Sequence, residues 1–179
     1  FLGFRSQNAA HRIAVEWEED GVNKEGVYVY RRDSSSRLNS AAGGWLFPGI
    51  HHHARFLVNE TAEQYSIDMQ SDDGSTRLLI RCERDEVFPR TSVFPSLAAA
   101  SVFVQAGSVG YSPSHGADCY DGLELRTHAW KVTALSVKEM RSSFFENQQL
   151  FPAGSVEFDC GLLMRGIPHE WRALPTLRG

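Results

Sequence analysis

This sequence of 179 residues lacks an excess of positive charge, long apolar runs and closely spaced cysteines. The formal net charge is −4, whereas nucleic-acid-binding domains normally carry a basic patch, so we expect no nucleic-acid partner. No apolar run reaches the roughly 18 residues that a membrane-spanning helix needs. We therefore expect no membrane partner either.

Cysteine is represented by three residues, Cys82, Cys119 and Cys160, which lie far apart and form no C-x-x-C pair. An odd number of distant cysteines indicates reduced thiols and a cytoplasmic protein rather than a disulfide framework. Nothing near Phe1 resembles a signal peptide. Because the sequence starts without Met, we expect further residues before Phe1.

The spacing of apolar residues favours a β-rich α+β fold formed by a single domain, residues 1–179. Segments with apolar residues at every second position, separated by polar turns, predict about eight short strands. The clearest are residues 11–17, 27–31, 50–59, 64–69, 77–83, 123–137 and 156–164. Helices are predicted over residues 35–42 and 95–106. This pattern is typical of a curled antiparallel sheet or barrel with few helices.

The strand predicted over residues 50–59 concentrates the groups best suited to chemistry. It follows an aromatic turn and contains three consecutive histidines and an arginine. Successive side chains of a strand point to opposite faces, so His51, His53 and Arg55 share one face and His52 lies on the other. That cationic face is the first candidate for a functional site.

The charged groups of this region favour a pocket for a small anion. Guanidinium groups suit a carboxylate, and histidines add hydrogen-bond donors that titrate near neutral pH. A glutamate held in an apolar wall could act as a general base. The candidate ligand-binding residues are His51, His53, Arg55, Arg126 and Arg37, and the candidate catalytic residues are Glu124 and Glu157. The alternative is that these charges only pair with one another across the sheet, at small energetic gain.

A metal site is a competing interpretation of the same residues. His51 and His53 form an H-x-H pair whose backbone positions are about 7 Å apart, within reach of one metal ion. Glu124 and His128 could complete the ligand set if the two strands were neighbours. The positive charge of Arg55 opposes a divalent cation, so we expect neither a metal nor a cofactor.

Motifs from Arg31 to Trp171 resemble those of a known family. They comprise residues 31–38, 47–55, 110–112, 121–126, 142–145, 151–152, 154–159, 162–165 and 169–171. The family is an uncharacterised bacterial one, domain of unknown function 2071, placed in the acetoacetate decarboxylase-like superfamily. The resemblance implies a barrel-like antiparallel sheet with a few helices around a small-molecule cavity.

The resemblance does not extend to the catalytic lysine of acetoacetate decarboxylases. Those enzymes use a lysine amine as a Schiff-base nucleophile, activated by desolvation or by a second cation. The three lysines of this chain, Lys24, Lys131 and Lys138, are not adjacent. Lys131 would lie on an apolar strand face if residues 123–137 formed one strand, and desolvation would then lower its pKa. A lysine that reaches solvent near a strand bend is the alternative.

These inferences together predict a protein that binds a small organic acid or carbonyl compound. If it is an enzyme, it acts on that compound as a lyase or hydrolase without a Schiff-base lysine. The alternatives are a non-catalytic ligand-binding or sensing module and a metal-dependent enzyme that uses the H-x-H pair. A homo-oligomer is left open.

Overall fold

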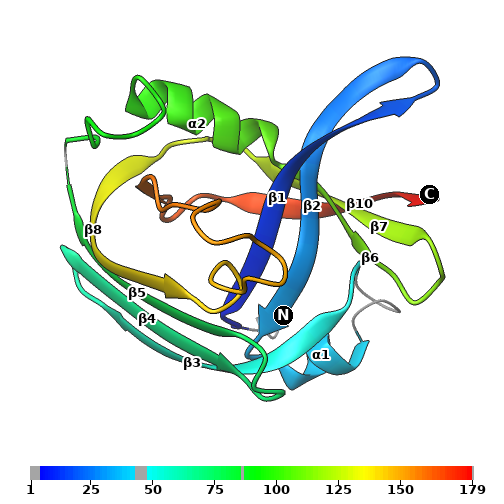
Figure 1. Cartoon of the computed structure of the whole chain (residues 1–179), viewed down its shortest axis with the longest axis horizontal. Helices are drawn as coiled ribbons and strands as arrows, with labels where there is room; N and C mark the ends of the chain where they lie inside the picture. Colours follow the sequence, from blue (N-terminus) through cyan, green and yellow to red (C-terminus); the bar gives the residue numbers. More distant parts are fainter. Residues whose placement is uncertain (1–4, 43–47, 86, 179) are drawn as a thin grey trace. The chain divides into compact units, whose positions relative to one another are not determined.

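The computed structural model describes residues 5–42, 48–85 and 87–178 as a strand-rich chain with two helices in that part (Figure 1). The chain divides into two compact units, each formed by segments that are distant in sequence. Unit 1 comprises residues 1–53, 103–129 and 168–179, and unit 2 comprises residues 54–102 and 130–167. The aromatic turn before the central strand includes residues 45–47, which lie outside the described residues.

Unit 1 is built on a long twisted hairpin (Figure 1). Its elements are β1 (Asn8–Glu19), β2 (Val22–Ser34), α1 (Arg37–Ala42), β6 (Val109–Pro113), β7 (Cys119–Thr127), β10 (His169–Arg178) and the start of β3 (His51–Glu60). One edge of β2 pairs with β1, and the other edge pairs in parallel with both β6 and β3. The antiparallel strands β7 and β10 then follow β6.

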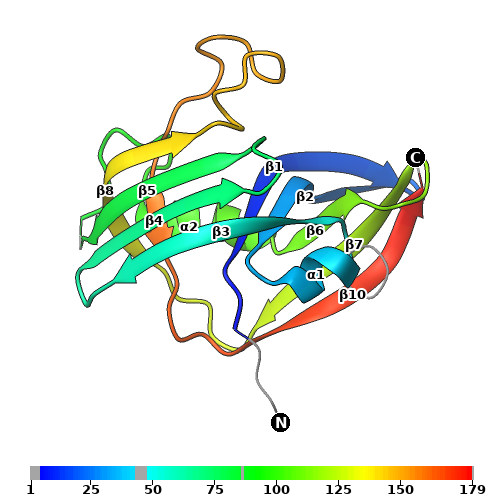
Figure 2. The same ribbon diagram turned by 90° about the horizontal axis from the view of Figure 1, so that it is seen from below.

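Unit 2 is an antiparallel sheet (Figure 2). It contains the rest of β3 together with β4 (Gln64–Ser71), β5 (Arg77–Arg84), β8 (Thr133–Ser142) and β9 (Gly161–Leu163). The helix α2 (Leu97–Ala106) starts in unit 2 and ends in unit 1. None of the helices in the described residues is both long enough and apolar enough to cross a membrane.

The β1–β2 hairpin turns tightly at Asp20 and Gly21. Both residues have positive φ angles, 54° and 75°, which is the conformation that an Asp-Gly pair supplies in two-residue hairpins. The strands consequently run further toward the turn than the alternation over residues 11–17 and 27–31 predicts. Pairing starts with Glu19 opposite Val22 at the turn and is unbroken as far as Arg12 opposite Val29.

Small and flexible apolar side chains form the buried core of unit 2. Met69 is fully buried on β4, and Ala54 and Ala134 are each 1% exposed. Beyond β8, Phe144 stacks edge-on against Phe145 with ring centroids 5.0 Å apart. The burial of Ala54 on β3 and Met69 on β4 agrees with the period-two pattern that predicted these strands, because one face of each strand carries the buried apolar residues.

Several predictions about the fold are confirmed and others are wrong. Both predicted helices form, as α1 and α2. The sheet is mixed rather than antiparallel, because β2 pairs in parallel with two strands. Pairing follows the order β10-β7-β6-β2-β3-β4-β5-β8-β9, with β1 on β2. In the described residues this order has two ends, so of the two predicted forms, a curled sheet or a barrel, the barrel is wrong.

The strand predicted over residues 123–137 is wrong as well. Residues 128–132 are irregular and separate β7 from β8, which belong to different units. The strand predicted over residues 156–164 shrinks to Gly161–Leu163. Trp171 is 49% exposed on β10.

Replacing Met69 with Ala should lower the free energy of unfolding by about 2–5 kcal/mol, because the substitution leaves a cavity in a closed core. The matched control is Leu57→Ala on the neighbouring strand β3, where the side chain is 72% exposed. That control should change stability by about 0.5 kcal/mol or less. Chemical denaturation of both variants gives the comparison, and equal losses would contradict the assigned core.

Candidate functional site

A β-bulge in the β1–β2 hairpin decides which side chains of β2 share a face. His11 pairs with Arg31, but the next residue, Arg12, pairs with Val29. Tyr30 is therefore an extra residue on β2, and the alternation of side chains shifts by one position there. Arg32, which lies opposite Ala10, consequently joins the face of β2 that carries Val29.

Arg32 is the buried cation at the centre of this face. Arg32 is 8% exposed, and its Nε donates a hydrogen bond to Ser112 Oγ at 2.9 Å. Ser112 lies on β6 and is itself 1% exposed. This is the only side-chain hydrogen bond that Arg32 makes to the described residues. The terminal nitrogens of the guanidinium are therefore left to bind something else.

Gly49 holds Arg32, Ser112 and His51 close together. Its φ angle is +80°, and a Cβ at this position would lie 2.9 Å from Ser112 Cβ and 3.2 Å from Arg32 Nε. The Gly49 amide donates to Asp121 Oδ2 at 3.1 Å, and its carbonyl oxygen lies 3.0 Å from His51 Nδ1. Only a residue without a side chain fits between these groups.

His51 pairs with Arg32 across the parallel β2–β3 ladder. Burial lowers the pKa of His51, and the positive charge of Arg32 lowers it further. The imidazole is thus largely neutral at pH 7. Since a carbonyl oxygen only accepts, Nδ1 carries the proton in its bond to Gly49, and Nε2 retains a lone pair.

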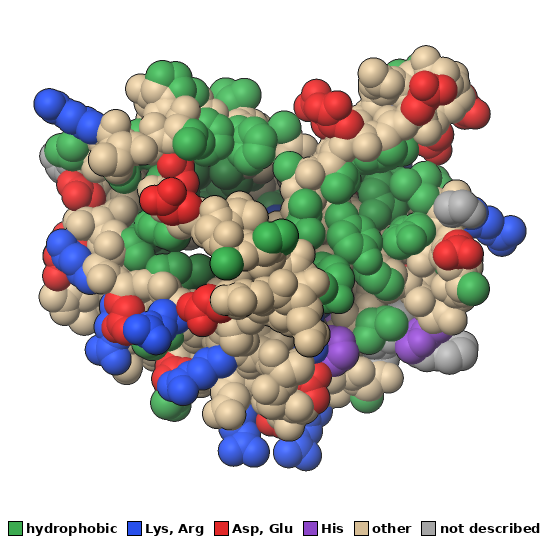
Figure 3. All heavy atoms as spheres, viewed as in Figure 1, with side chains coloured by type: hydrophobic (Ala, Val, Ile, Leu, Met, Phe, Trp, Pro, Cys, Tyr) green, Lys and Arg blue, Asp and Glu red, His purple; other side chains and the backbone are tan. Residues whose placement is uncertain are grey.

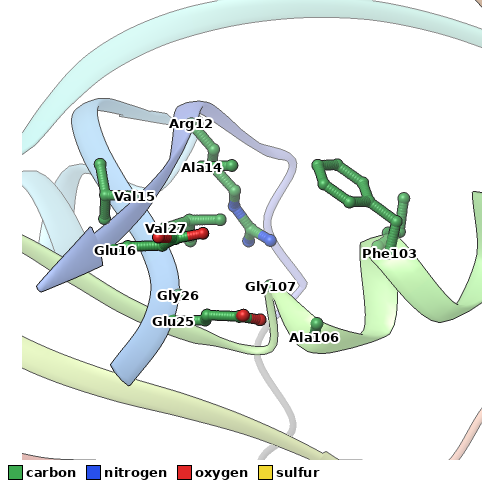
Figure 4. A pocket seen from close by; sticks show the side chains of 11 residues that line it. Arg12, Ala14, Val15, Glu16, Glu25, Gly26, Val27, Phe103, Ala106 and Gly107 are labelled. Atoms are coloured by element: carbon green, nitrogen blue, oxygen red, sulfur yellow. The ribbon is translucent and has the colours of Figure 1, made fainter. Parts of the chain in front are cut away.

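Arg12 is the second cation of this region. Alternation along β1 places it on one face with Ala10 and Ala14, whose small side chains leave room around the guanidinium. Arg12 extends from β1 into a hollow of about 720 Å³ that also reaches Phe103 and Gly107 (Figure 4). In the described part of the chain, the side chain of Arg12 makes no hydrogen bond or ion pair. Desolvation by the surrounding walls lowers its pKa.

A second hollow of unit 1, of about 610 Å³, is lined by Arg12, Arg32 and His51 together. We call it the arginine hollow. It is lined by Asn8, Ala9, Ala10, Arg12, Arg32, Asp33, Asn39, Pro48, His51, Leu123, Trp171 and Ala173. Its volume lies within the range typical of small-molecule sites. Three apolar residues from β7 and β10 stand beside the cationic ones, so the hollow offers both a charged and an apolar wall.

The arginine hollow carries a positive charge that the protein does not neutralise. Burial and the nearby Arg12 lower the pKa of Arg32 to about 10, so both guanidinium groups remain charged at neutral pH. The one carboxylate in the lining, Asp33, is held by Arg31 at 2.8 Å. In the described residues no carboxylate pairs with Arg12 or Arg32.

Another hollow of unit 1 is lined mainly by apolar groups and is less suited to an anion. Its walls include Trp17, Tyr111 and Leu174. Figure 3 shows hydrophobic side chains gathered beside the β1–β2 hairpin. The cation in its lining, Lys24, is paired with Glu19. The arginine hollow is therefore the better candidate for a functional site.

Of the predicted site residues, His51 lines the arginine hollow, whereas Glu124 and Arg126 do not. On β7 these two residues form an ion pair, with 2.9 Å between Arg126 Nε and Glu124 Oε2. Since Leu123 faces the hollow, strand alternation turns Glu124 to the opposite side. In the structure these two residues therefore do not share the arginine hollow with His51.

The remaining predicted residues also lie outside the arginine hollow. His53 is half-buried on β3 and pairs with Ser34, and Arg37 is exposed at the start of α1. Arg55 belongs to unit 2, where its side chain is 84% exposed and lies 3.4 Å from Asp72. Glu157 is exposed in an irregular segment of unit 2. The shared face of His51, His53 and Arg55 thus divides between the two units.

The metal and Schiff-base hypotheses find no support in the site geometry. Among the described residues no three His, Cys, Asp or Glu side chains come close enough to hold a metal ion. Lys131 lies in the irregular segment after β7 and is exposed, because the strand expected to bury it is interrupted. Burial and the neighbouring Asp159 raise the pKa of the Cys160 thiol to about 11, which disfavours the reactive thiolate at neutral pH.

Sequence reasoning missed Arg12, Arg32 and Ser112. Alternation does place Arg12 between two alanines on one face of β1, which was an available signal. No such signal marks Arg32, because strict alternation would have put Arg31 on the face of Val29. The bulge that reverses this order is visible only in the pairing register.

Comparison with known proteins adds no family or fold assignment. No protein-family model, curated protein or solved structure matches the chain.

Replacing Gly49 with Ala should lower the free energy of unfolding by about 1–3 kcal/mol, because the new methyl group is strained and also crowds Ser112. Gly21→Ala is the matched control, since Gly21 has a φ of +75° but nothing within 4 Å of an added Cβ. The Gly49 variant should be the less stable of the two in urea. Equal losses would show that the backbone angle alone accounts for the effect.

Stability should also depend on the protonation of His51. Its pKa is lowered from 6.5 in the folded state, so as pH falls below 6.5 the unfolded chain takes up a proton first and stability declines. His51→Gln should reduce this decline between about pH 7 and pH 5, measured as urea midpoints. The exposed His128 provides the control, and a His51 variant that titrates like His128→Gln would contradict the prediction.

Proposed function

We propose that unit 1 binds a small organic anion in the arginine hollow. The observation that carries the proposal is the buried guanidinium of Arg32. Ser112 holds its Nε, and none of the carboxylates in the described residues neutralises it. A buried charge is costly unless it is paired, so an anion from outside is the partner this site favours. A carboxylate matches the planar guanidinium with two parallel hydrogen bonds.

The apolar wall supports a ligand with a carbon skeleton rather than an inorganic ion. Leu123, Trp171 and Ala173 line the same hollow as Arg32. Burial of apolar surface contributes about 25 cal/mol per Å², which adds affinity to the charged contact. The proposal extends the predicted small-acid ligand to a different set of residues. Membership of the acetoacetate decarboxylase-like superfamily stays a prediction.

His51 favours enzymatic proton transfer as a second candidate function. Its neutral imidazole keeps an unprotonated Nε2 beside Arg32, and general bases act best with a pKa near the working pH. An acid bound at Arg32 with an ionisable C–H bond would be the substrate class. Exchange of the methyl protons of pyruvate for deuterium, followed by NMR, would test this role. Catalysed exchange should disappear in His51→Gln while anion binding persists. Exchange no faster than in buffer would leave only binding.

Replacing Arg32 with Met should abolish the binding of benzoate, chosen as a carboxylate with an apolar ring. At 100 times its dissociation constant a ligand stabilises the folded state by about 2.7 kcal/mol, which thermal unfolding detects readily. The unliganded variant should stay near wild-type stability, since removing a desolvated charge offsets the lost bond to Ser112.

Arg172→Met is the matched control for this experiment. Arg172 lies on β10 between Trp171 and Ala173 but is absent from the hollow lining. Benzoate should stabilise this variant as much as the wild type. Equal stabilisation of the Arg32 variant would end the proposal.

A further inference from the structure

Arg12 gives the arginine hollow a second, separate anion-binding group. It projects from β1, whereas Arg32 is on β2, and its guanidinium points into the hollow that Phe103 and Gly107 also line (Figure 4). The side chain of Arg12 has no hydrogen-bonding partner among the described residues, so all of its guanidinium donors are available. Its side chain lines both the arginine hollow and the neighbouring hollow at the end of α2.

The charges of its lining make the arginine hollow complementary to two negative charges. In the lining of the arginine hollow, Arg12 and Arg32 each contribute one positive charge, and Asp33 is neutralised by Arg31. Glu16 and Glu25 line only the neighbouring hollow, and among the described residues neither forms an ion pair with Arg12. The two guanidinium groups are near enough to repel each other, since Arg12 disfavours the charged form of Arg32. A monoanion at Arg32 would remove only half of this excess charge.

We infer that the arginine hollow takes an organic dianion, with one anionic group held at Arg32 and the second at Arg12. The inference rests on the proposed function, because it assigns a ligand class to the same site. The two charges can belong to the two ends of a dicarboxylate or to a single phosphate monoester. In either case Arg12 is the residue that separates dianions from monoanions, and Arg32 serves both.

Calorimetric titration at about pH 7.5 tests the inference with matched ligand pairs. Dicarboxylates from malonate to adipate are compared with monocarboxylates of the same chain length, and phenyl phosphate is compared with benzoate. We expect the best dianion to bind at least about tenfold tighter than its monoanionic match, since a charge-assisted contact at Arg12 is added. If a dicarboxylate shows the larger gain, the two negative charges lie on separate groups of the ligand. If phenyl phosphate shows it, both charges lie on one group.

The variant Arg12→Gln separates the role of Arg12 from that of Arg32. It should remove the tenfold preference, because dianion affinity should fall to about that of the matched monoanion, which Arg32 still holds. Arg172→Gln should retain both the preference and the affinities, and the unliganded midpoints should confirm that each variant is folded.

The outcomes distinguish this inference from the proposed function beneath it. If mono- and dianions bind equally well to the wild type, or if the preference survives in Arg12→Gln, the inference is overturned and the anion site remains. If neither class binds, the proposed function fails and the inference fails with it. A preference that depends on Arg12 supports both.

Discussion

The register of one hairpin determines the candidate site of this protein. A single extra residue, Tyr30, reverses the alternation of side chains along β2 and turns Arg32 toward the face of Val29 and Arg12. Without that residue, the arginine facing the hollow would be Arg31, which instead neutralises Asp33. β-Bulges often redirect a side chain in this way near functional sites. Here the redirected group is the buried cation on which the hollow depends.

The positive charge of the hollow has a cost in stability that the fold tolerates. Desolvation disfavours the charged form of Arg12, Arg32 and His51 alike, as the lowered pKa of each group shows. A sequence selected only for stability would place neutral or paired residues at such positions. Functional sites commonly retain such unfavourable arrangements, because the ligand supplies the missing interaction.

Local patterns in the sequence anticipated most strands and both helices but only one residue of the site. Period-two alternation located β3, β4 and β5, since each has one buried face, and it also put Arg12 on a defined face of β1. It could not reveal that β2 pairs in parallel with β3 and β6, because pairing depends on distant segments. The charged residues Arg55 and Glu157 attracted attention by composition, yet both lie exposed in unit 2. Placing Arg32 required the pairing register.

The position of Arg12 in the walls of two hollows bears on the size of the ligand as well as its charge. A partition made of one long, flexible side chain can rotate, whereas a backbone wall cannot. A chain attached to the bound anion could pass Arg12 and continue toward Phe103 and Gly107 at the end of α2. For the proposed anion, the rotamers of Arg12 would then set the upper limit on ligand length. Shortening that side chain would allow longer molecules to bind.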